Sequence, residues 1–216
     1  MAEWVSKNDY LTTEERDNNA VCFVEKMRQL FKKERITNKA LAGMLASIQG
    51  ESGINPGRWE MPHPAGTMNV GYGLCQWTPV SKIVYDYPPS WVGTGSWQTT
   101  TGDVQCKRIK WDMDNDQQWF SNDAAYLVGM PTDPPITFLE FITDRSLDEK
   151  TLATYWLLYY EHPREDLIVP DNTERRQWAS QWLEWIETGQ HVDPSGPSGG
   201  DLLILLAKYK IKNRKR

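Results

Sequence analysis

The chain has 216 residues and a formal net charge of −5, a size that suits one domain with a short appendage. Charged residues make up 25% and hydrophobic residues 39%, the mixture of a soluble globular protein, and the acidic balance argues against a nucleic-acid partner held through its phosphates. Tryptophan is frequent, with 11 residues, and its rings either pack cores or stack on flat ligands such as sugars.

Several kinds of segment are not expected. The opening residues, MAEWVSKNDYLTTEER, hold no apolar run of a secretory signal, and no stretch reaches the roughly 18 apolar residues of a transmembrane helix. The three cysteines, Cys22, Cys75 and Cys106, are an odd number at wide spacing, which predicts no disulfide framework. We therefore expect synthesis in the cytoplasm, which also fits a protein later carried on a particle.

The body of the chain, residues 1–189, is predicted to be mostly helical. Thr12 and Glu15 have the spacing of a capping box, in which each side chain satisfies the backbone of the other. This box predicts the start of a first helix over 13–34.

The second predicted helix, over 39–52 with Asn38 as its cap, carries a candidate catalytic residue near its end. At about 100° per residue, Glu51 falls at the border of the apolar stripe in the last turn, and no Lys or Arg lies within six residues of it. Partial desolvation and the negative end of the helix dipole should both raise the pKa of this carboxyl. A carboxyl that keeps its proton near neutrality can act as a general acid, although a Glu at a helix end also suits a cap or a salt bridge.

A Gly- and Pro-rich stretch over 53–79 predicts a loop with short strands. The sequence then predicts a helix over 103–119 and another over 146–161, the latter opened by a capping box of Ser146 and Glu149.

The last helix of the body is predicted to begin at Asn172 or Thr173. It places Trp178, Trp182 and Trp185 on one face, because they follow each other at intervals of four and three residues. We expect this face to be core, and a sugar-binding platform is the alternative.

Two short segments follow the body. Residues 190–200, QHVDPSGPSGG, have the composition of a flexible linker. Residues 201–216, DLLILLAKYKIKNRKR, carry six Lys or Arg and one Asp, so the tail has a charge of +5 and the rest −10. The tail suits a docking peptide that adds a strand to a neighbouring subunit, a segment that binds anionic polymers or lipids, or a disordered end.

Two blocks of the body carry a resemblance to a known family. The run AGMLASIQGESGINPGRW contains Glu51 and Ser52, and GYGLCQWTP follows with Gln76. The pair resembles the Glu-Ser … Gly-Leu-x-Gln signature of goose-type lysozymes and lytic transglycosylases, and the whole run looks more closely like the tail-associated lysozyme domains of small tailed phages. A third block, LATYWLLYYEHP, is similar to a late helix of those domains, so the resemblance covers roughly residues 10–187.

The resemblance implies roles for individual residues. Glu51 would be the catalytic acid that protonates the glycosidic oxygen between N-acetylmuramic acid and N-acetylglucosamine. Gln76 would be a substrate-facing amide on a small β-hairpin, and Tyr160 an aromatic group beside the acid. Glu161 would be a second catalytic carboxylate or, alternatively, a structural partner for Arg164.

Aromatic residues near these motifs are candidates for sugar binding. Trp59 and Trp77 flank the acid and the Gln motif, and we expect both to line a sugar cleft, together with Tyr72 of the second block. No metal and no organic cofactor are implied.

The identity of a second catalytic carboxylate stays open. Glycosidases commonly pair an acid with a base or nucleophile about 5–9.5 Å away, and the candidates are Glu60, Asp86, Asp112 and Glu161. Relatives with a single essential Glu also exist, so the sequence does not separate hydrolysis from formation of an anhydro product.

Three other functions have weaker support in the sequence. A cysteine peptidase or amidase would use Cys75 with His162 as its base, but Cys75 follows a Gly-rich stretch rather than opening a helix. A metallopeptidase is disfavoured, because the chain has only three His and no HExxH motif. A non-catalytic tail protein that binds glycan with the same fold is the third.

We therefore expect an α+β, lysozyme-like fold, predominantly helical with a small β-hairpin region and a catalytic cleft. The expected function is cleavage of bacterial peptidoglycan on a phage tail tip or knob as the genome is delivered. A lytic transglycosylase and an endolysin that acts at lysis are the alternatives. Other phage tail proteins are the expected partners of residues 201–216.

Overall fold

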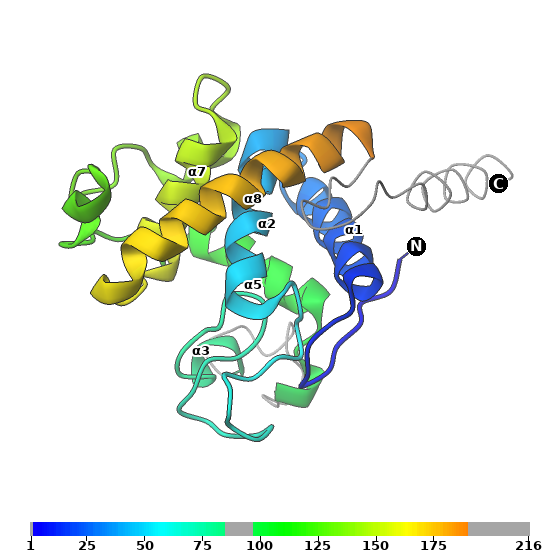
Figure 1. Cartoon of the computed structure of the whole chain (residues 1–216). Helices are drawn as coiled ribbons and strands as arrows, with labels where there is room; N and C mark the ends of the chain where they lie inside the picture. Colours follow the sequence, from blue (N-terminus) through cyan, green and yellow to red (C-terminus); the bar gives the residue numbers. More distant parts are fainter. Residues whose placement is uncertain (1, 85–96, 190–216) are drawn as a thin grey trace, which may run out of the picture.

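The computed structural model describes residues 2–84 and 97–189. The predicted linker and tail, 190–216, lie outside the described residues. The chain is predominantly helical, as predicted (Figure 1). The elements in chain order are α1 (Thr13–Leu30), α2 (Asn38–Ser52), α3 (Ser81–Val84), η1 (Trp97–Thr99), α5 (Gly102–Asp114), η2 (Ala125–Val128), α6 (Phe138–Thr143), α7 (Glu149–Trp156), η3 (Leu157–Glu161), η4 (Glu165–Leu167) and α8 (Ile168–Thr188).

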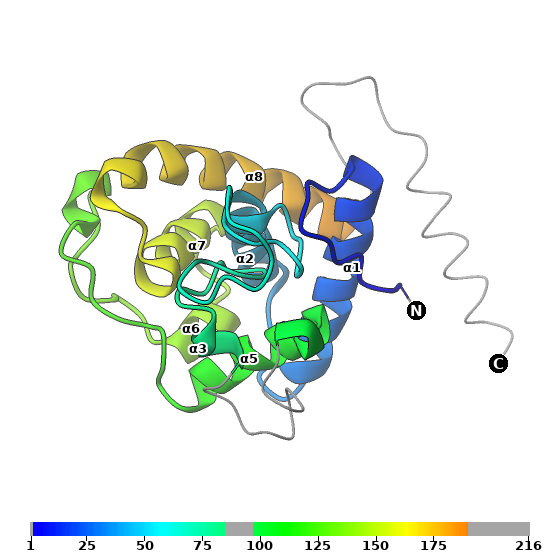
Figure 2. The same ribbon diagram turned by 90° about the horizontal axis from the view of Figure 1, so that it is seen from below.

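Helix α2 lies at the centre of the molecule. It packs against both α7 and α8, and Figure 2 shows it surrounded by the other long helices. Its residues from Ala40 to Ile48 are all buried, as expected of a helix that is apolar on every side. Gly43 allows α7 to come close, because a Cβ there would lie 3.0 Å from the backbone nitrogen of Ala153.

The helix starts agree only partly with the predicted caps. Thr12 and Glu15 form the predicted capping box of α1. For α2 the cap is Thr37 instead of Asn38, and its side chain accepts a hydrogen bond from the backbone of Ala40. For α7 the cap is Asp148 instead of Ser146. Both caps adopt the extended backbone that a cap requires, one residue before the first helical one.

The helix lengths also differ from the predicted ones. Helix α1 ends at Leu30. Helix α5 ends at Asp114 instead of Trp119, because Asp116 and Gln118 adopt positive φ angles of 51° and 59°. Helix α8 begins earlier than predicted, at Ile168, since Pro170 lies in the first turn, where its missing N–H costs no hydrogen bond.

The predicted β-hairpin region is reduced to two isolated bridges. Tyr72 pairs with Trp59 and with Trp77, and no longer strand forms in residues 2–84 or 97–189. The Tyr72–Trp77 bridge closes a tight turn through reciprocal backbone hydrogen bonds of 3.3 and 3.1 Å. Gly73 supports this turn with a φ of 80°, which residues with a Cβ adopt rarely.

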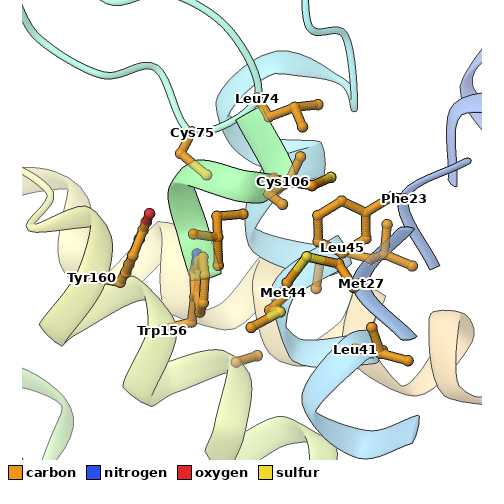
Figure 3. Packing of buried hydrophobic residues seen from close by; sticks show 14 of the residues in the cluster. Phe23, Met27, Leu41, Met44, Leu45, Leu74, Cys75, Cys106, Trp156 and Tyr160 are labelled. Atoms are coloured by element: carbon orange, nitrogen blue, oxygen red, sulfur yellow. The ribbon is translucent and has the colours of Figure 1, made fainter. Parts of the chain in front are cut away.

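One core unites the helices and the loop that follows α2. Figure 3 shows Phe23 and Met27 of α1 meeting the apolar side chains of α2, with Leu74 and Cys75 of the loop nearby. Trp182 and Trp185 are buried as predicted, whereas Trp178 is only half-buried. None of the helices in the described ranges is both long and apolar enough to cross a membrane.

Candidate functional site

A pocket of about 810 Å³ lies where the loop after α2, the turn η3 and the beginning of α8 meet. It brings together five residues predicted from the sequence as catalytic or substrate-binding. These are Glu51, Gln76, Trp77, Tyr160 and Glu161. The first comes from α2, two come from the loop and two from η3, so the fold gathers residues from three separate segments.

The end of α2 is locked to the loop that carries Gln76. Gly53 ends the helix in a left-handed conformation, with a φ of 69°. The hydroxyl of the neighbouring buried Ser52 donates to the carbonyl oxygen of Leu74 at 2.9 Å and accepts from the backbone N–H of Asn55 at 3.2 Å. Glu51 therefore lines the pocket, while the next residue, Ser52, holds the end of α2 against the loop that carries Gln76.

Glu51 has a cationic partner that is distant in sequence. Nη2 of Arg175, on α8, donates to Oε1 of Glu51 at 3.2 Å, and the side chain of Arg175 is only 4% exposed. Sequence reasoning missed this residue. The available signal was that Arg175 lies three positions before Trp178, at the edge of the tryptophan face, where a charge must have a partner.

Glu161 is held beside Glu51. Nε1 of the buried Trp156 donates to Oε1 of Glu161 at 3.0 Å, while Oε2 is buried with no protein donor among the described residues. The alternative that Glu161 pairs with Arg164 is wrong, because Arg164 forms a salt bridge of 2.7 Å with Asp166. Glu161 therefore lines the same pocket as Glu51 without a salt bridge to Arg164.

The two carboxyls affect each other's protonation. Desolvation raises the pKa of Glu51, and the charge of Asp171 adds to the rise, while Arg175 opposes it. Burial and the charge of Glu51 raise the pKa of Glu161 well above its ordinary range. Two close carboxyls do not both ionise easily, so the pair retains a proton at pH values where an exposed Glu has lost it.

The other predicted second carboxylates are less well placed. Glu60 lines the pocket, but its Oε2 accepts from the backbone N–H of Gly71 at 2.9 Å and supports the loop. Asp112 is fully buried and accepts from the hydroxyl of Tyr160 at 2.8 Å, which fixes the Tyr160 side chain in the pocket wall. Asp86 lies outside the described residues.

Gln76 is oriented by its own loop. Its Nε2 donates to the carbonyl oxygens of Arg58 at 3.1 Å and Gly73 at 3.0 Å, and its backbone adopts a φ of 46°. Non-glycine residues adopt such a conformation only at a cost, which is common at functional sites.

Trp59 and Tyr72 are not part of the pocket wall. Trp59 is fully buried, with its ring 4.5 Å from that of Tyr72 and 5.3 Å from that of Trp97. This aromatic cluster packs within the molecule, so the geometry gives no support to sugar contacts by Trp59 or Tyr72. An exposed ring that the sequence analysis did not single out, Phe120, lines the pocket and is 48% exposed.

The site chemistry disfavours a cysteine nucleophile. Cys75 and His162 both line the pocket. Burial and the nearby carboxyls of Glu161 and Glu51 raise the pKa of the Cys75 thiol well above its ordinary value, which opposes formation of a thiolate. Burial also lowers the pKa of His162. Within residues 2–84 and 97–189, no cluster of three or more His, Cys, Asp or Glu has the arrangement of a metal site.

Comparison with known proteins places the chain near phage tail proteins. A family described as phage tail lysozyme matches residues 23–186. Morphogenesis protein 1 of Bacillus phage B103 is 33% identical over 179 residues, which cover 83% of this chain and 42% of that protein. The chain thus spans less than half the length of this relative.

Proposed function

Because the chain belongs to the phage tail lysozyme family, we propose that it cleaves the glycosidic bond between N-acetylmuramic acid and N-acetylglucosamine in bacterial peptidoglycan. The enzyme would be carried on the virion, at the tip or knob of the tail, and would open the host cell wall as the genome is delivered. The name of the phage B103 relative, a morphogenesis protein, supports a place in the virion.

One observation carries this proposal. Glu51 and Glu161 lie together in one pocket beside Arg175, and burial raises the pKa of both carboxyls. Glycosidic cleavage requires an acid that still holds its proton near neutral pH, and a carboxyl in such surroundings meets this requirement.

In the proposed reaction, Glu51 donates its proton to the glycosidic oxygen while the bond from that oxygen to C1 breaks. The electron pair of the bond leaves with the oxygen, and the sugar carbon develops positive charge. Addition of a water molecule to C1, with return of its proton to Glu51, completes hydrolysis; addition of the C6 hydroxyl of the same sugar, with return of its proton to Glu51, gives an anhydro product. Glu161 and Arg175 govern the protonation of Glu51, and the ionised pair left after transfer would be opposite the developing positive charge.

The remaining walls suit a carbohydrate. Phe120 offers an exposed ring surface, and Trp77, Gln76 and Tyr160 also line the pocket. We propose Trp77, Gln76, Tyr160 and Phe120 as the residues that contact the sugar chain.

The proposal is tested by Glu51→Gln, which keeps the shape of the side chain but removes the acid. We expect loss of turbidity reduction on purified cell walls by at least about 100-fold, since a general acid contributes that much or more. Glu14→Gln, on the exposed first turn of α1, is the matched control and should retain activity. Equal activity of wild type and Glu51→Gln would contradict the proposal and favour a non-catalytic tail protein that binds glycan.

Mass spectrometry of the products separates the two chemistries. Reducing ends indicate a hydrolase, and 1,6-anhydro ends indicate a lytic transglycosylase. Detection of the protein in purified virions distinguishes the tail enzyme from an endolysin that acts only at lysis.

A further inference from the structure

Beside the proposed general acid, Glu51, the structure places a buried cation, Arg175. Arg175 is buried, its Nη2 donates to Glu51, and its Nε has no hydrogen-bond partner among the described residues. A buried guanidinium with an unsatisfied N–H lowers the stability of the fold, so a role in the pocket would account for Arg175 at this place.

The backbone of α2 makes room for this side chain. A Cβ at Gly50 would lie 1.8 Å from Cζ of Arg175 and 1.9 Å from its Nη1. Any residue other than glycine would therefore displace the guanidinium from its path across the helix. Gly50 precedes Glu51 directly, so one position admits the cation and the next carries the carboxyl that it binds.

The charges of Arg175, Glu51 and Glu161 sum to zero when the two glutamates hold one proton between them. Arg175 carries one positive charge, and Glu51 and Glu161 together carry one negative charge when they share a proton. The buried Oε2 of Glu161 has no hydrogen-bond partner among the described residues, so a negative charge on this carboxyl is poorly stabilised. Asp171 of α8 and Cys75 of the loop also face the pair, and neither supplies a positive charge.

We propose that Arg175 is a positioning residue that keeps the Glu51–Glu161 pair in a state with a single shared proton. The absence of a side chain at Gly50 lets the guanidinium of Arg175 reach Glu51. This inference rests on the proposed function for its catalytic meaning, but the protonation state can be measured without any substrate. Arg175 acts through Glu51 and does not itself need to touch the sugar.

The direct test is a pH titration by NMR of protein labelled with ¹³C in the glutamate carboxyls. Wild type should show one buried Glu that stays protonated at neutral pH. In Arg175→Gln the attraction that favours ionisation is lost, so both carboxyls should keep their protons to higher pH, by about 1 unit or more. The alkaline limb of the pH–activity profile should move upward by a similar amount.

Two further variants keep the test independent of any folding defect. Gly50→Ala leaves the arginine in the chain but displaces it, so it should shift the titration in the same direction as Arg175→Gln. Arg175→Lys keeps the charge and should restore part of the wild-type titration. Arg176→Gln is the control, because Arg176 lies next in sequence but donates to Thr154 instead, and its titration should match wild type.

The outcomes are distinguishable from failure of the proposed function. If wild type cleaves cell walls but folded Arg175→Gln and Gly50→Ala both titrate like wild type, the inference about Arg175 is overturned. If the titration shifts as expected but no variant, including wild type, cleaves walls, the inference about the shared proton holds and the proposed function fails. A merely structural role would lower thermal stability without moving either the titration or the pH profile.

Discussion

Asp112 holds the pocket residue Tyr160 in place and makes the free energy of unfolding depend on pH. It is fully buried, pairs with Arg108 and accepts the hydroxyl of Tyr160. Desolvation raises the pKa of Asp112 from 3.8 to about 6, although Arg108 opposes the rise. The folded protein therefore holds this proton more tightly than the unfolded chain. Its stabilising effect is complete below about pH 4 and is lost as the pH rises through about 6.

The variant Asp112→Asn isolates this effect. A shift of about two pKa units corresponds to about 3 kcal/mol, so the free-energy difference between wild type and variant should shrink by up to that amount from pH 4 to pH 7. Urea unfolding at both pH values, followed by tryptophan fluorescence, measures it. The same difference at both values would show that Asp112 does not titrate as described.

At the level of residues, the sequence predicts what depends on local spacing. Glu51 was identified because helical periodicity places it at the edge of a buried stripe. Arg175 was missed because 124 residues separate it from Glu51, and no local pattern reports such a contact. Trp59 was expected in a sugar cleft from its loop position, yet it is buried, because the loop itself folds over an aromatic cluster.

Among the elements, α2 depends most on close packing. A Cβ at Gly43 would lie 3.0 Å from the backbone nitrogen of Ala153 and 3.1 Å from the carbonyl carbon of Leu152. These are backbone atoms of α7 and cannot move aside as a side chain does. The packing between α2 and α7 is thus fixed by a single missing methyl group.

We predict that Gly43→Ala lowers the free energy of unfolding by up to about 2 kcal/mol. Alanine is favoured over glycine in a helix by roughly 1 kcal/mol, but overpacking against a rigid backbone typically costs about 1–3 kcal/mol. Urea unfolding measures the net change. The glutamate titration of Gly43→Ala should match that of wild type, in contrast to the titration of Gly50→Ala. A stabilised Gly43→Ala protein would mean that α7 can shift.

The sequence was least informative about where elements begin and end. The predicted caps, Asn38 and Ser146, lie one residue after Thr37 and two residues before Asp148, which are the caps in the structure, because several residues near each helix start can cap. Helix α6 was not predicted, although Thr137 and Glu140 form a capping box, because six residues show no clear period. The composition predicts a loop with short strands over 53–79 and the family resemblance implies a small β-hairpin there, whereas the structure forms isolated bridges.

At the scale of the whole molecule, charge is unevenly distributed. Residues 201–216 carry +5, so the remainder carries −10. An acidic enzyme is not attracted to an anionic cell wall by its overall charge, so attachment to a particle would deliver it better than diffusion. The tail combines an apolar block, LLILL, with a basic end, which makes it the segment to test for attachment.

Deletion of 201–216 should remove the protein from purified virions and leave the wall-cleaving activity of the body unchanged. Two matched variants show whether charge or apolar contact attaches the tail to the virion. Replacement of the six basic residues with Gln removes charge alone, and replacement of LLILL with serines removes apolar contact alone. If the tail docks on another tail protein through its apolar block, the serine variant should be lost from virions, whereas the Gln variant should be retained at low and high salt. Normal incorporation of the complete deletion would show that the body, and not the tail, binds the particle.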